Sequence, residues 1–171
     1  IKNAIYRLKF GEHFFLQLLM ALRKETHARE GTNPLNKTGP HVKLIFDQLP
    51  FELTSAQKRV LKEIRFDIEK PVTMNRLLQG DVGSGKTIVA LIAAANVIES
   101  GYQVAFMAPT EILANQHYTL ANKIFNESNI KTDFLTGKIS NSERKIKINA
   151  LKENNINIIF GTHALFQKKT E

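Results

Sequence analysis

Residues 80–87 limit the possible folds of this chain more than any other feature. They read Gly-Asp-Val-Gly-Ser-Gly-Lys-Thr and fit the pattern G-x-x-x-x-G-K-[ST] at every fixed position. A short apolar run at 76–79 precedes the pattern, and a helix-like segment at 86–100 follows it. A glycine-rich loop between a strand and a helix can turn its backbone N–H groups around phosphate oxygens. The sequence therefore predicts nucleotide binding on an α/β fold.

The residues of this loop have different expected roles. Lys86 offers a charge that can reach the β- and γ-phosphates, and the hydroxyl of Thr87 is placed to ligate Mg²⁺. These two are the predicted catalytic residues, and Thr87 is the predicted metal ligand. The predicted phosphate-binding residues are Gly80, Asp81, Val82, Gly83, Ser84, Gly85, Lys86 and Thr87. Kinases, GTPases, transporters and motors share this pattern, so it leaves the reaction open.

Recognition of the nucleotide base is expected from residues outside the loop. A GTPase would carry Asn-Lys-x-Asp downstream, but the Asn-Lys pair of this chain, Asn36-Lys37, lies upstream, so a GTPase is disfavoured. Gln57 offers a planar amide that suits the adenine edge, and Phe51 could stack on the base. Taken alone, this signal is weak, and Gln57 fits better as an ordinary first-turn residue of a capped helix.

From the loop onward, short apolar runs alternate with amphipathic segments of helical length. The expected strands are 76–79, 104–108, 132–135 and 156–160, and the expected helices are 86–100, 111–126 and 141–153. This alternation is typical of βαβ units. We therefore predict an open, mostly parallel α/β sheet flanked by helices.

The first part of the chain has a different pattern. Apolar residues at helical spacing predict a helix over 4–30, whose apolar face must pack against another surface. Glycines and prolines in 31–50 predict a loop or extended connection. A second helix should begin after Thr54, because Thr54 and Gln57 match a capping box, and should run to about Glu69.

Composition excludes several classes of site. The chain has no cysteine, which rules out disulfides, thiolate zinc sites, iron–sulfur clusters and cysteine nucleophiles. Its formal net charge of +8 makes a polyanion a sensible partner. Apolar stretches fall well short of the roughly 20 residues of a membrane span, and no signal pattern begins the chain. We expect a cytoplasmic protein that does not contact membranes.

Three loops should lie at the carboxyl ends of parallel strands, where open α/β sheets place their ligands. They contain Pro109 and Thr110, Thr136 and Gly137, and Thr162 and His163. A helix that begins at such a loop can offer free N–H groups to a nucleic-acid phosphate. The alternative is that these residues are ordinary turn and cap residues, and that His163 is structural.

The ordered motifs LTSAQ, GDVGSGKT, APTEILANQHY, TGK and GTHALFQ resemble the first motor lobe of superfamily-two DNA helicases, and most closely the RecG family. The resemblance covers 49–167 well and the preceding helix more loosely. Transcription-repair coupling translocases are similar in GDVG-x-GKT and GTH, but typically have an aromatic residue at the position of Ser84.

This resemblance implies a fold and a set of roles. It implies that 49–171 form a RecA-like P-loop NTPase lobe, and that 1–48 form a helical linker from a wedge domain. ATP and Mg²⁺ are the implied cofactors, with Gln57 and Phe51 at the adenine. DNA is the implied partner, at the residues Pro109, Thr110, Thr136, Gly137, Thr162 and His163.

The resemblance also implies parts that this sequence lacks. An apolar strand ending in Asp-Glu-x-His should position the attacking water, and no such motif follows the loop. We expect a lobe truncated before this motif, with a second motor lobe and a wedge domain in the full-length chain, and little activity in the fragment. The expected function is ATP-dependent unwinding or branch migration of branched DNA in recombination and repair. The alternatives are a coupling-type translocase, a non-catalytic ATP-binding module and a small-molecule kinase.

Overall fold

The computed structural model describes residues 2–29, 31–37, 39–137 and 139–163. In chain order, the elements are α1 (Lys2–Arg29), α2 (Pro40–Gln48), α3 (Ser55–Ile68), α4 (Lys86–Glu99), β1 (Val104–Met107), α5 (Glu111–Phe125), β2 (Thr132–Leu135), α6 (Asn141–Lys152) and β3 (Ile158–Gly161). Among the described helices, none combines the length and apolar character that crossing a bilayer requires.

The three strands form a parallel sheet in the order β1-β3-β2, so the predicted α/β class is confirmed. β3 is central, and all of its residues are buried. Ile158 and Phe160 pack into the main core with α4 and α5, while Ile159 joins a smaller cluster beneath α6. This alternation places α4 and α5 on one face of the sheet and α6 on the other.

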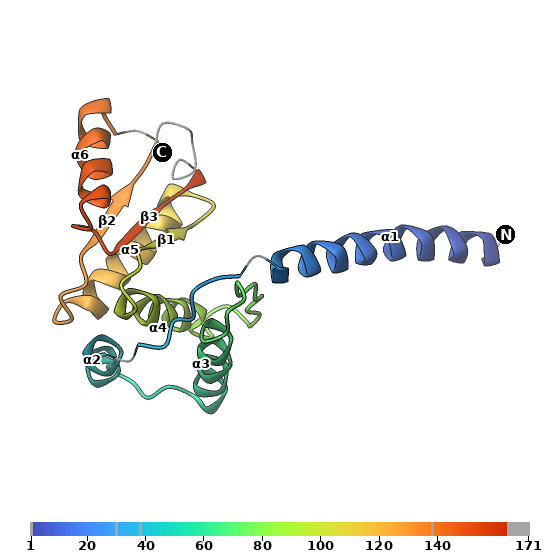
Figure 1. Cartoon of the computed structure of the whole chain (residues 1–171), viewed down its shortest axis with the longest axis horizontal. Coiled ribbons are helices and arrows are strands. Elements are labelled where there is room, and N and C mark those ends of the chain that lie inside the picture. Colours follow the sequence, from blue (N-terminus) through green and yellow to red (C-terminus); the bar gives the residue numbers. More distant parts are fainter. Residues whose placement is uncertain (1, 30, 38, 138, 164–171) are drawn as a thin grey trace.

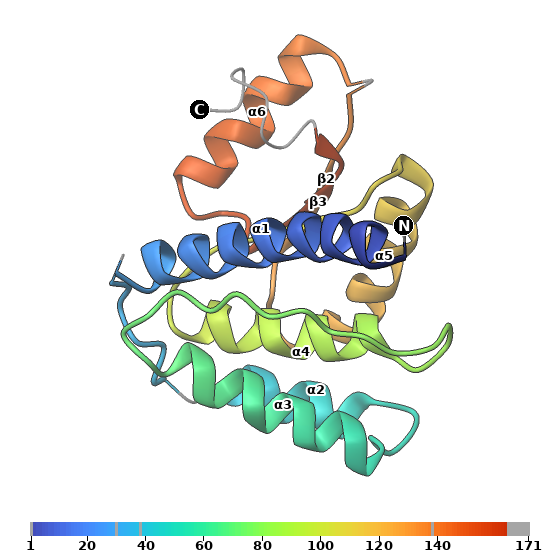
Figure 2. The same ribbon diagram turned by 90° about the vertical axis from the view of Figure 1, so that its right-hand side faces the viewer.

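α4 lies between the sheet and the layer that contains α2 and α3 (Figure 2). Leu91, Ile92 and Ala95 are almost completely buried, because α4 has neighbours on both sides. A helix with apolar residues around most of its circumference is stable only in such a central position. The first residue of α4 is Lys86, so the most buried helix of the molecule fixes the end of the phosphate loop.

The predicted strand at 76–79 is wrong: these residues are extended but pair with no strand in the described chain. An extended segment becomes a strand only when a neighbouring backbone accepts and donates its hydrogen bonds. Here the segment follows α3 and α4 instead, with Leu78 packed on Ile64, Ile68 and Val89. Side-chain contacts, not a sheet ladder, therefore hold the segment that leads into the phosphate loop.

The predicted loop over 31–50 is also wrong in part, because Pro40–Gln48 form α2. Pro40 occupies the first turn, where a missing N–H costs nothing. The Glu99 carboxylate accepts hydrogen bonds from the backbone N–H groups of Gly39 at 2.8 Å and Val42 at 2.9 Å. Ile45 is fully buried in the main core. A distant acidic side chain thus supplies the cap that the local sequence lacks.

α1 forms as predicted, but its expected packing does not (Figure 1). The helix projects away from the rest of the molecule, and its large apolar side chains are exposed, among them Leu8, Phe15 and Leu18. One contact within the helix is the stacking of Phe10 on Phe14, whose ring centroids lie 6.0 Å apart. The helix therefore arises from its own sequence rather than from burial against the described residues.

Candidate nucleotide-binding site

The phosphate loop curves around the amino group of Lys86. Lys86 Nζ donates hydrogen bonds to the carbonyl oxygens of Gly80 at 2.7 Å and Asp81 at 2.6 Å. Gly83 and Gly85 have φ angles of 83° and 80°, in the left-handed region that glycine adopts most readily. Gly85 caps α4 without any side-chain hydrogen bond, so the first N–H groups of α4 keep their capacity to donate. The loop thus combines a cation and a helix N-terminus at one point, as an anion site requires.

Gln57 links α3 to this loop. Its Oε1 accepts a hydrogen bond from the Thr54 N–H at 2.9 Å, and its Nε2 donates to the Ser84 carbonyl oxygen at 2.9 Å. The Thr54 hydroxyl in turn accepts from the Gln57 N–H, which completes the predicted capping box. Both ends of the amide are therefore engaged, one within α3 and one on the loop.

A cavity of about 360 Å³ lies between α3 and the loop. Its polar wall contains Gln57, Gly80, Asp81, Ser84 and Lys86, all of which are predicted site residues. Its apolar wall is formed by Val60, Leu78 and Val89, which the sequence analysis did not single out. A cavity that is apolar on one side and cationic on the other suits a base and its phosphates.

Thr87 fits the predicted metal role. It is half-buried in the first turn of α4, directly after Lys86, and its hydroxyl makes no hydrogen bond within the described chain. Mg²⁺ commonly takes one or two protein ligands and completes its shell with phosphate oxygens and water. The described residues contain no cluster of three or more acidic, histidine or cysteine side chains that could hold a metal without a nucleotide.

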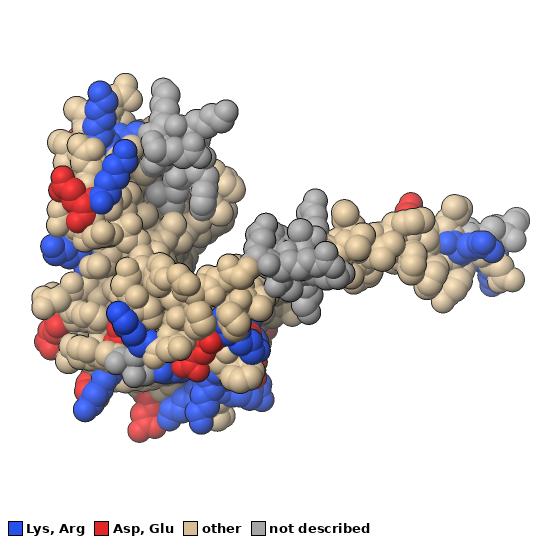
Figure 3. Space-filling view, in the orientation of Figure 1, with Lys and Arg blue, Asp and Glu red and all other residues tan. Residues whose placement is uncertain are grey.

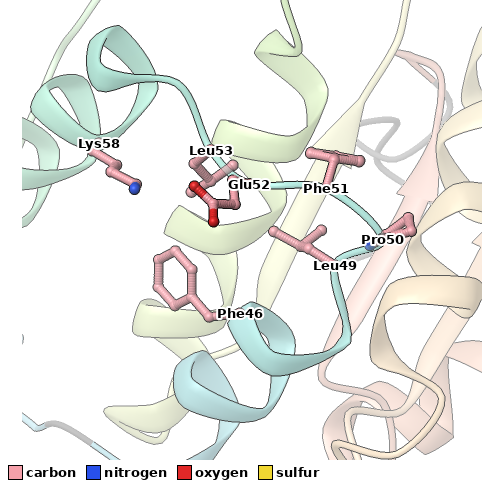
Figure 4. Close-up of a pocket in the computed structure, with 7 residues that line it drawn as sticks. All are labelled: Phe46, Leu49, Pro50, Phe51, Glu52, Leu53 and Lys58. Atoms are coloured by element: carbon pink, nitrogen blue, oxygen red, sulfur yellow. The ribbon is translucent and has the colours of Figure 1, made fainter.

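Phe51 does not lie in this cavity. It belongs to a neighbouring pocket of about 420 Å³ lined by Phe46, Leu49, Pro50, Phe51, Glu52, Leu53 and Lys58. Figure 4 shows Phe51 well apart from Phe46, with Leu49, Glu52 and Leu53 between them, and Phe51 is 48% exposed. Stacking of Phe51 on adenine therefore stays a prediction, and would require a nucleotide that reaches past Gln57.

The three predicted DNA-facing loops lie together. Met107 of β1 and Leu135 of β2 both pair in register with Gly161 of β3, so all three strands end at one edge of the sheet. The residues that follow are Pro109, Thr110, Thr136, Gly137, Thr162 and His163, and they are exposed or half-buried. The Thr110 hydroxyl accepts a hydrogen bond from the Leu113 N–H at 3.3 Å and so caps α5. The expected alternative, that Thr110 is a cap residue, therefore holds for this position. The motif residues after His163 lie outside the described residues.

Charge alone does not mark a nucleic-acid path. On the face shown in Figure 3, basic side chains lie over α6, around α3 and on α1, and acidic side chains lie near those over α6 and around α3. On α3 the acidic side chains Glu63, Asp67 and Glu69 pair with neighbouring cations. The loops at the sheet edge therefore remain the better candidates for contact with phosphates.

Comparison with known proteins agrees with this site. The model of the DEAD/DEAH box helicase family matches residues 54–171. ATP-dependent DNA helicase RecG of Aquifex aeolicus is 44% identical over 165 residues, which cover 96% of this chain and 21% of that protein. RecG of Bacillus subtilis is 44% identical over 174 residues, covering 100% of this chain and 25% of the relative. The chain thus spans about a quarter or less of these curated relatives.

Solved structures give the same result. A structure of RecG bound to a three-way DNA junction superposes with a TM-score of 0.86 and 42% identity, covering 95% of this chain and 22% of that chain. A hypothetical ATP-dependent RNA helicase from Sulfolobus tokodaii shares the fold, with a TM-score of 0.55 and 19% identity over 78% of this chain and 38% of that one. The parallel sheet is therefore that of a RecA-like helicase lobe. The chain belongs to the DEAD/DEAH box helicase family and is similar over nearly its whole length to RecG helicases.

Proposed function

We propose that this chain contributes the first motor lobe of an ATP-dependent DNA helicase that acts on branched DNA. In this proposal residues 49–171 form the lobe, residues 1–48 form an extension, and a second lobe and a wedge domain belong to the same full-length protein. The observation that carries the proposal is the cationic loop at the N-terminus of α4, where Lys86 Nζ lies 2.7 and 2.6 Å from two loop carbonyl oxygens. The names of the RecG relatives, and the DNA junction bound by one of them, support DNA as the partner. With DNA as substrate, the expected location is the cytoplasm.

Nucleotide binding would exchange the partners of two side chains. The phosphates of ATP would take the Lys86 ammonium from the carbonyl oxygens of Gly80 and Asp81, because a charged acceptor forms the stronger hydrogen bond. Adenine would take the Gln57 amide from Ser84 and Thr54. Thr87 would hold Mg²⁺, which neutralises charge on the phosphates. The first exchange loosens a contact within the loop and the second loosens the contact between the loop and α3, so nucleotide occupancy would be linked to loop conformation.

The loops at the sheet edge supply the connection to DNA. Thr110, Thr136 and Thr162 each follow the end of a strand whose neighbours are fixed by parallel pairing. Backbone N–H groups and hydroxyls at such positions contact phosphates without reading sequence. Movement of this lobe against a second lobe would then move the bound backbone.

The test is DNA-stimulated ATP hydrolysis by the full-length protein. We expect Lys86→Ala to abolish the hydrolysis at an unchanged melting temperature, and Lys62→Ala, an exposed lysine on α3, to leave it unchanged. We also expect DNA binding to weaken as salt rises, because phosphate contacts release counterions. Unchanged turnover in Lys86→Ala contradicts the proposal, and nucleotide binding without any turnover in the wild-type protein favours a non-catalytic module.

A further inference from the structure

Arg76 makes an unusually complete set of contacts for a residue outside the cavity. Its Nη1 donates to Glu63 Oε2 at 2.8 Å, and its Nε and Nη2 donate to Asp67 Oδ2 at 3.0 and 2.5 Å. Glu63 and Asp67 are four residues apart on α3 and therefore lie on one face of the helix. Every nitrogen of the guanidinium thus bonds to a carboxylate of the same helix.

The ion pair between Arg76 and Asp67 shifts the pKa of each group toward its charged form. Lys70 and Arg76 both hold the pKa of Asp67 below its ordinary value, with the Lys70 hydrogen bond the larger cause. The hydrogen bond to Asp67 raises the pKa of Arg76. Both groups are therefore charged at neutral pH, as the ion pair requires.

Arg76 lies four residues before Gly80, in the extended segment that has no strand partner in the described chain. Between them, Leu78 packs on Ile64, Ile68 and Val89 and lines the nucleotide cavity. Apolar packing holds the segment against α3 and α4 but does not fix its position along α3, because apolar contact is non-directional. The three directed bonds of Arg76 supply that position.

The phosphate loop is thus joined to α3 at two points. One is the bond from Gln57 to the Ser84 carbonyl oxygen, and the other is the bond set of Arg76 with Glu63 and Asp67. In the proposed function adenine takes the Gln57 amide, which removes the first point. Arg76 then remains as the directed polar connection between α3 and the segment entering the loop.

We infer that Arg76 is a positioning residue for the nucleotide site: through Glu63 and Asp67 it keeps the phosphate loop in register with α3 while Gln57 engages the base. This inference rests on the proposed function. It assigns Arg76 no contact with the nucleotide. Arg76 acts by setting the separation between Gln57 and Lys86, which face the same cavity from different segments.

The test compares Arg76→Met with Arg65→Met in the full-length protein. Arg65 pairs at 2.9 Å with Glu69, the C-cap residue of α3, so it is a matched control for the loss of an ion pair whose partner is not in the segment before the loop. Affinity for a fluorescent ATP analogue, the KM for ATP, the kcat and the melting temperature are measured for each variant. We expect Arg76→Met to weaken nucleotide binding and to raise the KM for ATP by roughly two- to fivefold, with a smaller change in kcat. We expect Arg65→Met to leave the affinity, the KM and the kcat unchanged.

Further variants separate positioning from folding. Arg76→Lys keeps the charge but cannot bond both carboxylates in the same way, so it should lose part of the affinity. Asp67→Asn should weaken binding more than Glu63→Gln, because Asp67 accepts two of the three bonds. The double variant Arg76→Met/Asp67→Asn should be no weaker than Arg76→Met alone, because both remove one interaction. If Arg76→Met does not fold, a loss of affinity in Arg76→Lys and Asp67→Asn at unchanged melting temperature supports the inference.

The outcomes distinguish this inference from the proposed function. A wild-type protein that binds no ATP overturns both. A wild-type protein that binds ATP, together with an Arg76→Met variant of equal affinity, overturns the positioning role alone. Equal losses in Arg76→Met and Arg65→Met also overturn it, because any ion pair on α3 would then serve.

Discussion

Gly83 and Gly85 differ in what a methyl group would meet, and this difference gives a quantitative prediction. Both residues have positive φ angles, 83° and 80°, so alanine at either position is forced into the left-handed region at a cost of about 1–2 kcal/mol. A Cβ at Gly83 would meet nothing within 4 Å, whereas a Cβ at Gly85 would lie 2.4 Å from Gln57 Nε2. Alanine at Gly85 must therefore also displace the Gln57 amide from Ser84.

The expected destabilisation follows from these two terms. Gly83→Ala should lower the free energy of unfolding by about 1–2 kcal/mol, through backbone strain alone. Gly85→Ala should lower it by about 1.5–3.5 kcal/mol, since the lost hydrogen bond adds about 0.5–1.5 kcal/mol to the same backbone strain. The measurement is urea unfolding of the 171-residue chain followed by circular dichroism.

A double-mutant cycle isolates the role of Gln57. In the wild-type background Gln57→Ala should cost about 1 kcal/mol, because it removes the capping box and the bond to Ser84. In the Gly85→Ala background it should cost less, because the bond to Ser84 is already lost and only the Gln57 part of the capping box remains to be removed. Two outcomes would refute the displacement of Gln57 by a side chain at position 85. One is equal destabilisation by Gly83→Ala and Gly85→Ala, and the other is full additivity of Gln57→Ala with Gly85→Ala.

Two further predictions concern stability. Glu99→Ala should lower the free energy of unfolding by about 1 kcal/mol and accelerate hydrogen exchange in α2, because the Gly39 and Val42 N–H groups lose their acceptor. Glu99→Gln keeps one acceptor oxygen and should lose less stability. Equal exchange rates in the wild type, Glu99→Ala and Glu99→Gln would refute the capping role of Glu99. Burial lowers the pKa of His117, whose ring lies 5.2 Å from that of Phe106, so its neutral form is favoured in the folded state. The unfolded chain therefore binds the proton first, and the melting temperature should fall as the pH drops below about 6.5, less steeply in His117→Gln; identical pH profiles would contradict this assignment.

The sequence predicts most reliably what local chemistry decides. The capping box of Thr54 and Gln57 depends on residues three apart in the sequence, and it is present. The predicted strand at 132–135 is also present, paired with β3. The carboxyl-edge grouping of the three loops also followed, because parallel strands end together.

The features that were missed depend on partners distant in the sequence. α2 has no local acceptor for its first N–H groups and is capped by Glu99, about 60 residues away. The strand expected at 76–79 lacks a neighbouring backbone, and the same segment is held by Glu63 and Asp67 through Arg76. The apolar face of α1 was expected to pack, but helix formation does not itself supply a partner surface. No periodicity in the sequence signals any of these three outcomes.

In the proposed function, Lys86 lies in the site of an ATP-driven DNA motor. The most direct measurement is the rate at which the full-length protein converts a three-way DNA junction to separated products, with and without ATP. We expect ATP-dependent conversion by the wild-type protein and none by Lys86→Ala, although both bind the junction with similar affinity. ATP-independent conversion, or conversion at the wild-type rate by Lys86→Ala, would contradict the account.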